Sequence, residues 1–177
     1  MSPRGDGAPR GRYRAAVSEP TSVVQPALPP PVMRKLGNPV MRALVSSPLH
    51  RVVGGALLVL HVRGRRSGTP YDIVAAVHDL GGAHTVFTHA PWRANVRGGA
   101  DVEITWNGRR RPARATLVED PALVAPVYLA QVERFGWKQA QRRLGMKLAV
   151  DRAPTADEML DAVRRHGFSL VRLDIAA

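Results

Sequence analysis

The sequence predicts an α+β fold that is mainly β: a barrel of about six mostly antiparallel strands with flanking helices. Between residues 56 and 118, short apolar runs follow one another closely and are separated by glycine-containing turns. One of these turns is Asn107-Gly108, the strongest short-range signal for a β-hairpin. Patterns of helical spacing flank this region on both sides. The length of 177 residues favours one domain.

The first three strands are expected before residue 90. Ala56–Val62 is an apolar run too short for a typical helix, so it predicts a strand that ends at the 64–68 loop. Tyr71–His78 predicts the second strand. The turn Leu80-Gly81-Gly82 then leads into a third strand, His84–Thr88.

The next two strands, Val102–Trp106 and Arg111–Val118, flank Asn107-Gly108. A type I′ turn requires positive φ at both central residues, which Asn and Gly tolerate. Phe168–Ile175 alternates between apolar and polar residues and predicts a sixth strand.

Helices are predicted between the fifth and sixth strands. Asp120 is suited to an N-cap and Pro121 to the first helical position. A second helix is predicted over Trp137–Leu148, past the break at Gly136. The segment Thr155–Glu158 is a capping box, in which the Thr and Glu side chains satisfy free amides of one turn.

The N-terminal segment differs in composition from the rest of the chain. Seven of the 15 prolines lie between Pro3 and Pro31, together with several arginines. Such a segment buries too little apolar surface to offset the entropy of ordering it, so residues 1–31 are expected to be a disordered basic tail and residues 32–177 the folded domain. Apolar residues within 38–53 recur near helical spacing and predict two short amphipathic helices.

Composition limits the chemistry and the partners. The chain has no cysteine, which excludes disulfides, thiolate metal sites and Cys nucleophiles and favours a reducing cytoplasm. The net charge of +12 suits phosphate, nucleic acid, anionic lipid or a polyanionic cofactor, although an arginine-rich proteome would also produce it. Aromatic residues make up only 5% of the chain, without the interleaved pattern that stacks bases, so specific nucleic-acid binding is not expected.

The loop Gly64-Arg65-Arg66-Ser67-Gly68 is the first candidate binding element. Its glycines permit positive φ and leave backbone N–H groups uncovered, while two guanidiniums and a hydroxyl add donors for phosphate or carboxylate oxygens. The same residues fit a solvated basic turn equally well. The loop lacks the longer spacing of a P-loop.

A second candidate element is Ala90-Pro91-Trp92-Arg93-Ala94-Asn95, just after the third strand. Trp92 and Asn95 are three residues apart and lie on one side of a helical turn. There the indole would cover an aromatic ligand, and the amide would bind a carbonyl or ribityl hydroxyl. In the alternative, Trp92 belongs to the core and Asn95 caps a helix.

No metal site or catalytic residue emerges from the sequence. The six histidines lack metal-ligand spacing; His61, His78 and His89 could meet on neighbouring strands, but scattered histidines are the simpler interpretation. Neither a nucleophile elbow nor a nucleophile–base pair is recognisable, so hydrolysis is not expected.

The order of these motifs resembles the nitroreductase-like flavin and deazaflavin oxidoreductases of actinobacteria. The resemblance covers roughly residues 38–175 and consists of an apolar strand into Gly-Arg-Arg-Ser-Gly, a strand pair, Pro-Trp-x-x-Asn, and Arg-Gly-Gly-x-x-Val before the next strand. It implies a split β-barrel like that of pyridoxine phosphate oxidases. The cofactor that it implies is the 8-hydroxy-5-deazaflavin coenzyme or, as runner-up, FMN. A homodimer is an assembly to consider.

The resemblance also implies roles for individual residues. Arg65, Arg66 and Ser67 would hold the phosphate and oligoglutamate tail, and Trp92 and Asn95 would line the cofactor pocket. The remaining positions expected around this pocket are Arg63, Gly64, Gly68, His89 and Pro91. Arg63 and His89 depart from the family, whose members tend to have Thr and Gly there.

The implied activity is hydride transfer from the reduced coenzyme to a small quinone, nitro compound or other conjugated acceptor. An alternative is a non-catalytic carrier of a lipid, haem or flavin ligand. Such a carrier would lie on the anionic inner face of the membrane through residues 32–53, which include Arg34, Lys35, Arg42 and Arg51.

Overall fold

The computed structural model describes residues 22–27 and 55–176 and contains a seven-stranded sheet in the order β3-β2-β6-β7-β9-β5-β4. All neighbouring strands in it are antiparallel. The strands are β2 (Leu57–Arg63), β3 (Pro70–Ala76), β4 (His78–Leu80), β5 (Ala83–Thr88), β6 (Ala100–Trp106), β7 (Arg109–Val118) and β9 (Ser169–Ile175).

The sheet closes because one bent strand changes its partner. Only Val77 separates β3 from β4, yet β3 pairs with β2 and β4 pairs with β5, at the opposite end of the strand order. The backbone N–H of Val77 donates to the carbonyl of Ala56 at 2.9 Å. If β3 and β4 are counted as one strand, the sheet is a six-stranded barrel, which confirms the predicted fold class.

Local sequence explains the hairpin between β6 and β7. Asn107 has φ 51° and Gly108 has φ 71°, and the register pairs Trp106 with Arg109 across the two-residue loop. Inward-facing residues of these and the neighbouring strands form the barrel core, in which Leu58, Leu60 and Ile104 are fully buried.

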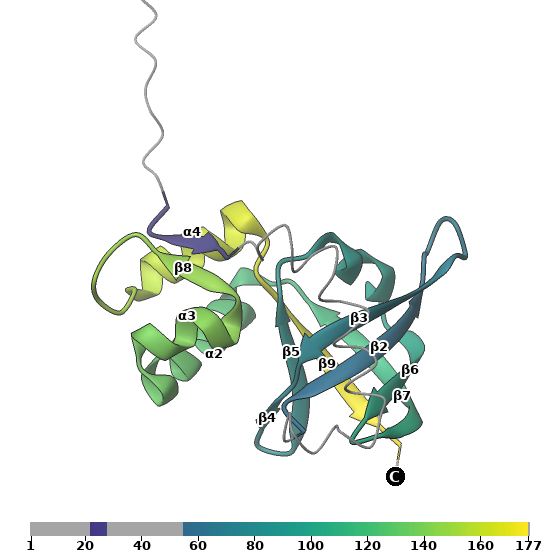
Figure 1. Ribbon diagram of the computed structural model, residues 1–177. Helices are drawn as coiled ribbons and strands as arrows, with labels where there is room; N and C mark the ends of the chain where they lie inside the picture. The colour runs from purple at the N-terminus through teal and green to yellow at the C-terminus, as the bar shows by residue number, and fades with distance from the viewer. Residues whose placement is uncertain (1–21, 28–54, 177) are drawn as a thin grey trace, which may run out of the picture.

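A helical lobe packs on the outside of the barrel and has a core of its own (Figure 1). It consists of α2 (Pro121–Phe135), α3 (Trp137–Leu144), α4 (Ala156–His166) and a two-stranded ribbon of β1 (Val24–Pro26) and β8 (Met146–Leu148). Phe87 of β5 and Leu170 of β9 join this core, so the lobe covers these two strands.

The predicted caps are present, but one helix is shorter than predicted. Asp120 Oδ1 accepts a hydrogen bond from the N–H of Ala122 at 2.9 Å, and both bonds of the 155–158 capping box form. The prediction of a helix through Leu148 is wrong, because α3 ends at Leu144 and the left-handed Gly145 redirects the chain. Met146 and Leu148 then alternate inward as strand β8.

The N-terminal segment differs from the expectation at residues 22–27, which were assigned to the disordered tail. They include β1, which pairs antiparallel with β8, and the side chain of Val24 is fully buried in the lobe core. The remainder of residues 1–31 and the amphipathic helices predicted within 38–53 lie outside the described residues. Among the helices that are described, none combines the length and apolar content needed to cross a membrane.

Candidate functional site

The loop of residues 64–69 joins β2 to β3 and is closed by its own backbone. The N–H of Gly64 donates to Thr69 O at 2.9 Å, and the N–H of Gly68 donates to Gly64 O at 2.7 Å. Gly68 has φ 67°, a conformation that favours glycine. Ser67 Oγ accepts the N–H of Thr69 at 3.2 Å, so this hydroxyl helps to shape the turn.

Asn95 ties this loop to the 3-10 helix η3 (Pro91–Val96). Its Oδ1 accepts the backbone N–H of Arg65 at 2.8 Å, across 30 residues of sequence. Its Nδ2 donates to Trp92 O at 2.9 Å and to the hydroxyl of Tyr71 at the start of β3. One amide thus joins three elements around a common opening.

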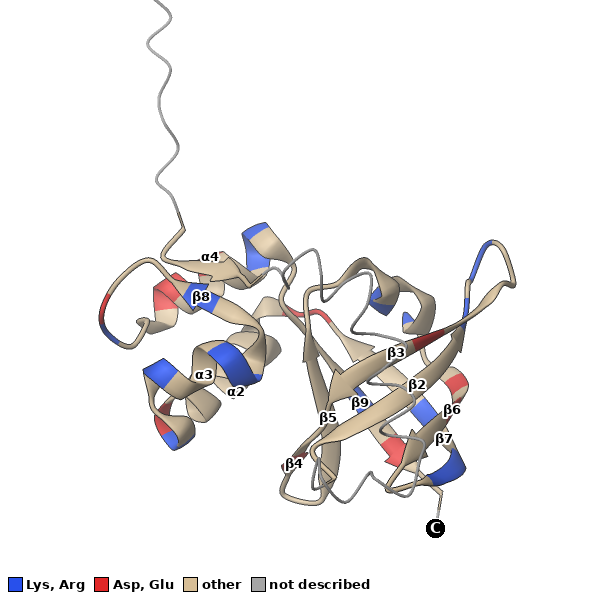
Figure 2. Ribbon diagram, viewed as in Figure 1, with Lys and Arg blue, Asp and Glu red and all other residues tan. Residues whose placement is uncertain are grey.

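The opening is a pocket of about 630 Å³, called the loop pocket below. It is lined by Gly64, Arg65, Arg66, Ser67, Tyr71, Ala94, Asn95 and Arg97. Arg65 and Arg66 are exposed, and no carboxylate among the described residues pairs with either guanidinium. Figure 2 shows blue on one side of the β2–β3 hairpin tip and no red at the tip.

Arg97, the third guanidinium of the loop pocket, is paired. Its Nε and Nη2 donate to the two carboxylate oxygens of Glu119, each at 2.8 Å. This pairing lowers the pKa of Glu119 and raises that of Arg97. The free positive charge of the pocket therefore comes from Arg65 and Arg66.

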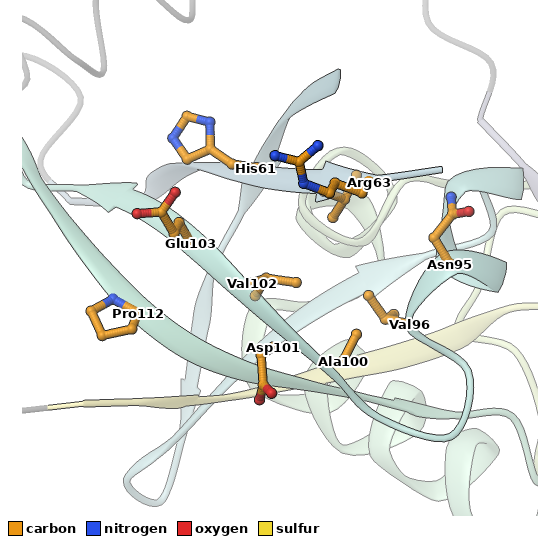
Figure 3. A pocket seen from close by; sticks show the side chains of 10 residues that line it. His61, Arg63, Asn95, Val96, Ala100, Asp101, Val102, Glu103 and Pro112 are labelled. Carbon is orange, nitrogen blue, oxygen red and sulfur yellow. The ribbon is translucent and has the colours of Figure 1, made fainter. Parts of the chain in front are cut away.

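A second pocket opens where β2 and β6 separate. Their pairing stops at His61 and Glu103, and beyond it Val62 and Arg63 diverge from the start of β6. The pocket, called the seam pocket below, has a volume of about 400 Å³. Figure 3 shows β2 side chains on one side, β6 side chains on the other and η3 at one end. The lining residues are His61, Val62, Arg63, Asn95, Val96, Ala100, Asp101, Val102, Glu103 and Pro112.

The polar groups at the rim of the seam pocket are held by neighbours. Arg110 donates to Glu103 at 2.5 Å and lowers its pKa, and Arg114 donates to Asp101 at 2.8 Å. His61 Nδ1 lies 2.6 Å from Asp72 Oδ1, and its Nε2 lies 2.8 Å from Thr105 Oγ1. Both ring nitrogens of His61 are thus occupied.

The structure brings most of the predicted site residues together. Gly64, Arg65, Arg66 and Ser67 line the loop pocket, Arg63 lines the seam pocket, and Asn95 lines both. Gly68 shapes the turn and Pro91 starts η3.

Trp92 and His89 line neither pocket. Trp92 packs against the barrel core. His89 lies against Phe168 with ring centroids 5.5 Å apart, and burial lowers its pKa. The side chain of His89 therefore belongs to the junction between the barrel and the helical lobe.

The described histidines lie in different surroundings. His61 contacts Asp72 and Thr105, whereas His78 makes an edge-to-face contact with Phe87 and His89 makes one with Phe168. Within residues 22–27 and 55–176, no cluster of three or more His, Asp or Glu side chains could hold a metal ion.

Sequence reasoning gave no site role to three lining residues of the loop pocket, Tyr71, Ala94 and Arg97. Arg97 belongs to the Arg97-Gly98-Gly99 segment noted for its place before a strand, but its side chain was given no role. Tyr71 was assigned only as the first residue of a strand. Nothing in its sequence neighbourhood predicts the contact with Asn95.

Comparisons with known proteins return remote structural similarities only; no protein-family model and no curated protein matches the chain. A pyridoxamine 5′-phosphate oxidase-related, FMN binding protein from Nostoc punctiforme is 15% identical, with 84% of this chain and 82% of that chain covered and a TM-score of 0.43. A protein named F420 Reductase is 14% identical, with 77% and 93% covered and a TM-score of 0.39. The FAD and Heme binding protein from Mycobacterium smegmatis is 15% identical, with 78% and 66% covered and a TM-score of 0.39.

Proposed function

We propose that the protein is a deazaflavin-dependent oxidoreductase, which transfers a hydride from the reduced 8-hydroxy-5-deazaflavin coenzyme to a quinone, a nitro compound or another conjugated acceptor. FMN is the runner-up cofactor. The motif order of the sequence suggests this class. The geometry supports it through one observation: the guanidiniums of Arg65 and Arg66, which pair with no carboxylate of the described residues, stand at a pocket that shares Asn95 with the partly apolar seam pocket.

The two pockets together suit a ligand with an anionic end and a flat, less polar end. Arg65 and Arg66 supply charged donors for phosphate oxygens, and Asn95 holds the loop that carries them. The side chains of Val62, Val96 and Val102 give the seam pocket apolar walls. This donor set fits a phosphorylated flavin or deazaflavin.

For the proposed hydride transfer, the protein needs chiefly to bind and orient the cofactor. A reduced deazaflavin supplies the hydride when it is bound. The residues of the loop pocket would hold its anionic part, and the seam residues would exclude water from one side of the ring and leave the other side to the acceptor. A dedicated metal is not required for this step.

Binding of the purified full chain to candidate cofactors tests the proposal. Titrations with the deazaflavin coenzyme, FMN and haem should show saturable binding of a flavin-type cofactor by absorbance or fluorescence. Turnover is then followed as loss of the reduced-coenzyme signal on addition of a quinone or nitro acceptor. If no cofactor binds below about 100 µM, equivalent to about −5 kcal/mol, the oxidoreductase proposal is wrong.

Removing the free charges of the loop tests where the anionic part binds. The double variant Arg65→Ala/Arg66→Ala should bind the cofactor at least about tenfold more weakly at low salt, because two charge-assisted hydrogen bonds are lost. The difference should shrink as salt is added. A matched control, Arg142→Ala/Arg164→Ala, removes the same charge from exposed positions of the helical lobe and should bind like the unmodified chain. Equal affinity of the loop variant and the control would show that the loop is only a turn.

A further inference from the structure

The orientation of the Asn95 amide is determined by two backbone groups. The N–H of Arg65 can only donate, so the Asn95 atom that faces it at 2.8 Å is the oxygen. The carbonyl of Trp92 can only accept, so the atom that faces it at 2.9 Å is the nitrogen. A flipped amide would place donor against donor and acceptor against acceptor.

This orientation assigns the role of the Tyr71 hydroxyl. Asn95 Nδ2 is the group in contact with it, and an amide nitrogen can only donate, so the phenol oxygen is the acceptor of that bond. The proton of the phenol must therefore point elsewhere. No other hydrogen-bond partner of this hydroxyl occurs among the described residues.

The position of the Tyr71 ring directs that proton to the loop pocket. The ring packs against the barrel core, and the residue also lines the loop pocket beside Arg65 and Arg66. A ring anchored by packing has little rotamer freedom left to lose when its hydroxyl binds a ligand. Tyr71 is thus a preorganised neutral donor next to two free cations.

We propose that Tyr71 donates its hydroxyl proton in a hydrogen bond to a phosphoryl oxygen of the ligand in the loop pocket, and so makes the site selective for phosphorylated over phosphate-free ligands. The inference rests on the proposed function for the identity of the ligand as a flavin or deazaflavin phosphate. Guanidiniums attract any anion, whereas a fixed phenol also requires an acceptor oxygen at one place, which a tetrahedral phosphoryl group provides.

Matched ligand pairs test this assignment. FMN and riboflavin differ only in the phosphate, and the deazaflavin coenzyme and its deazariboflavin core differ in the phosphate-linked tail. Tyr71→Phe keeps the ring that packs on the barrel and removes only the hydroxyl. It should weaken binding of the phosphorylated member of a pair about tenfold, the usual effect of losing one hydrogen bond to a charged group, and leave the phosphate-free member unchanged.

Tyr128→Phe is the matched control, because the Tyr128 hydroxyl donates to Ser169 O in the buried core and lines neither pocket. Its affinity ratio between phosphorylated and phosphate-free ligands should equal that of the unmodified chain. The inference is overturned if Tyr71→Phe also leaves this ratio unchanged, or if the unmodified chain binds both members of each pair equally.

Inorganic pyrophosphate separates this inference from the proposed function. If the unmodified chain binds neither flavin nor deazaflavin, the oxidoreductase proposal fails, and pyrophosphate titration by calorimetry then decides the role of Tyr71. About tenfold weaker pyrophosphate binding by Tyr71→Phe supports it. Equal binding by the two proteins, or none by the unmodified chain, overturns it.

Discussion

At the scale of single residues, Asn95 holds the conformation of the 64–68 loop through its backbone and does not bind the charged side chains of the loop. The amide binds the backbone N–H of Arg65, so the loop conformation does not depend on the guanidinium of that residue. The side chains of Arg65 and Arg66 pair with no carboxylate of the described residues, whereas that of Arg97 is paired with Glu119. Substitution of the two free arginines should therefore change anion affinity more than stability.

His78 is a titratable residue that is half-buried at the junction of the barrel and the helical lobe. Its ring lies 5.0 Å from Phe87 and 6.1 Å from Phe135, and its Nε2 has no hydrogen-bond partner within the described part of the chain. Burial lowers its pKa, and the charges of Arg143 and Arg134 act in the same direction, whereas a hydrogen bond to the backbone of Arg143 acts in the opposite direction. Burial in the folded protein thus favours the neutral form of this imidazole.

This lowered pKa predicts a loss of stability in mild acid. Below the ordinary value of 6.5, the unfolded chain protonates His78 before the folded protein does, so the free energy of unfolding falls as the pH drops. His78→Gln should reduce this slope between about pH 7 and 5, as measured by urea unfolding. His89, whose pKa burial also lowers, should account for part of the remaining slope. Identical slopes for the unmodified chain and His78→Gln would contradict the prediction.

At the scale of elements, the capping box at the start of α4 should make a measurable contribution to the free energy of unfolding. Thr155 Oγ1 accepts the N–H of Glu158, and Glu158 Oε2 accepts the N–H of Thr155 at 2.8 Å. Arg152 also donates to both carboxylate oxygens, and these bonds lower the pKa of Glu158 to about 2. The carboxylate is therefore charged and bonded at neutral pH.

Thr155→Ala should lower the free energy of unfolding by about 1 kcal/mol at neutral pH, because one free amide of α4 loses its acceptor. Thr155→Ser keeps the hydroxyl and should lose much less. The stabilisation from Glu158 is complete above the ordinary pKa of 4.5 and is lost as the pH falls toward 2, so Glu158→Gln should flatten the acid limb of the stability curve. Thermal or urea unfolding measures both effects, and equal stability of the Ala and Ser variants would argue against the cap.

The elements that sequence predicts well are those determined by neighbouring residues. Asn107-Gly108 fixes its hairpin through the backbone conformations that these two residues tolerate. Strands β8 and β1 were missed for the opposite reason: Met146–Leu148 is too short to show a period, and it becomes a strand only by pairing with Val24–Pro26, far away in sequence. The local sequence signal for the early end of α3 is Gly145, which adopts a left-handed conformation there.

At the scale of the whole molecule, two cores meet at one junction. The barrel core and the lobe core are separate clusters, with Phe87 and Leu170 reaching from the barrel strands into the lobe. The sequence predicts the strands that make the barrel, but not that the strand through Val77 changes partners, because closure depends on the accumulated twist of the other strands. The seam pocket likewise arises from where β2 and β6 diverge.

The candidate site was predictable in part for the same reason. Two short sequence motifs contain Arg65, Arg66 and Asn95, and these residue types indicate which ligand groups they can bind. The fold brings the three residues together. Tyr71 lines the loop pocket because of its strand register and packing. His89 does not line it, because its ring packs toward Phe168. Such contacts depend on residues distant in sequence, which a local pattern does not encode.

The separation of the two cores predicts that damage to the lobe lowers stability without changing the site. Val24 is fully buried in the lobe core, so Val24→Ala should lower the free energy of unfolding by about 2 kcal/mol through the cavity it leaves. Leu123→Ala, at a 60% exposed position of the same lobe, is the control and should change it by less than about 0.5 kcal/mol. Both variants should keep the cofactor affinity of the unmodified chain, because neither residue lines a described pocket. Unchanged stability of Val24→Ala would mean that β1 does not dock in solution, and weakened binding would mean that lobe and site are coupled.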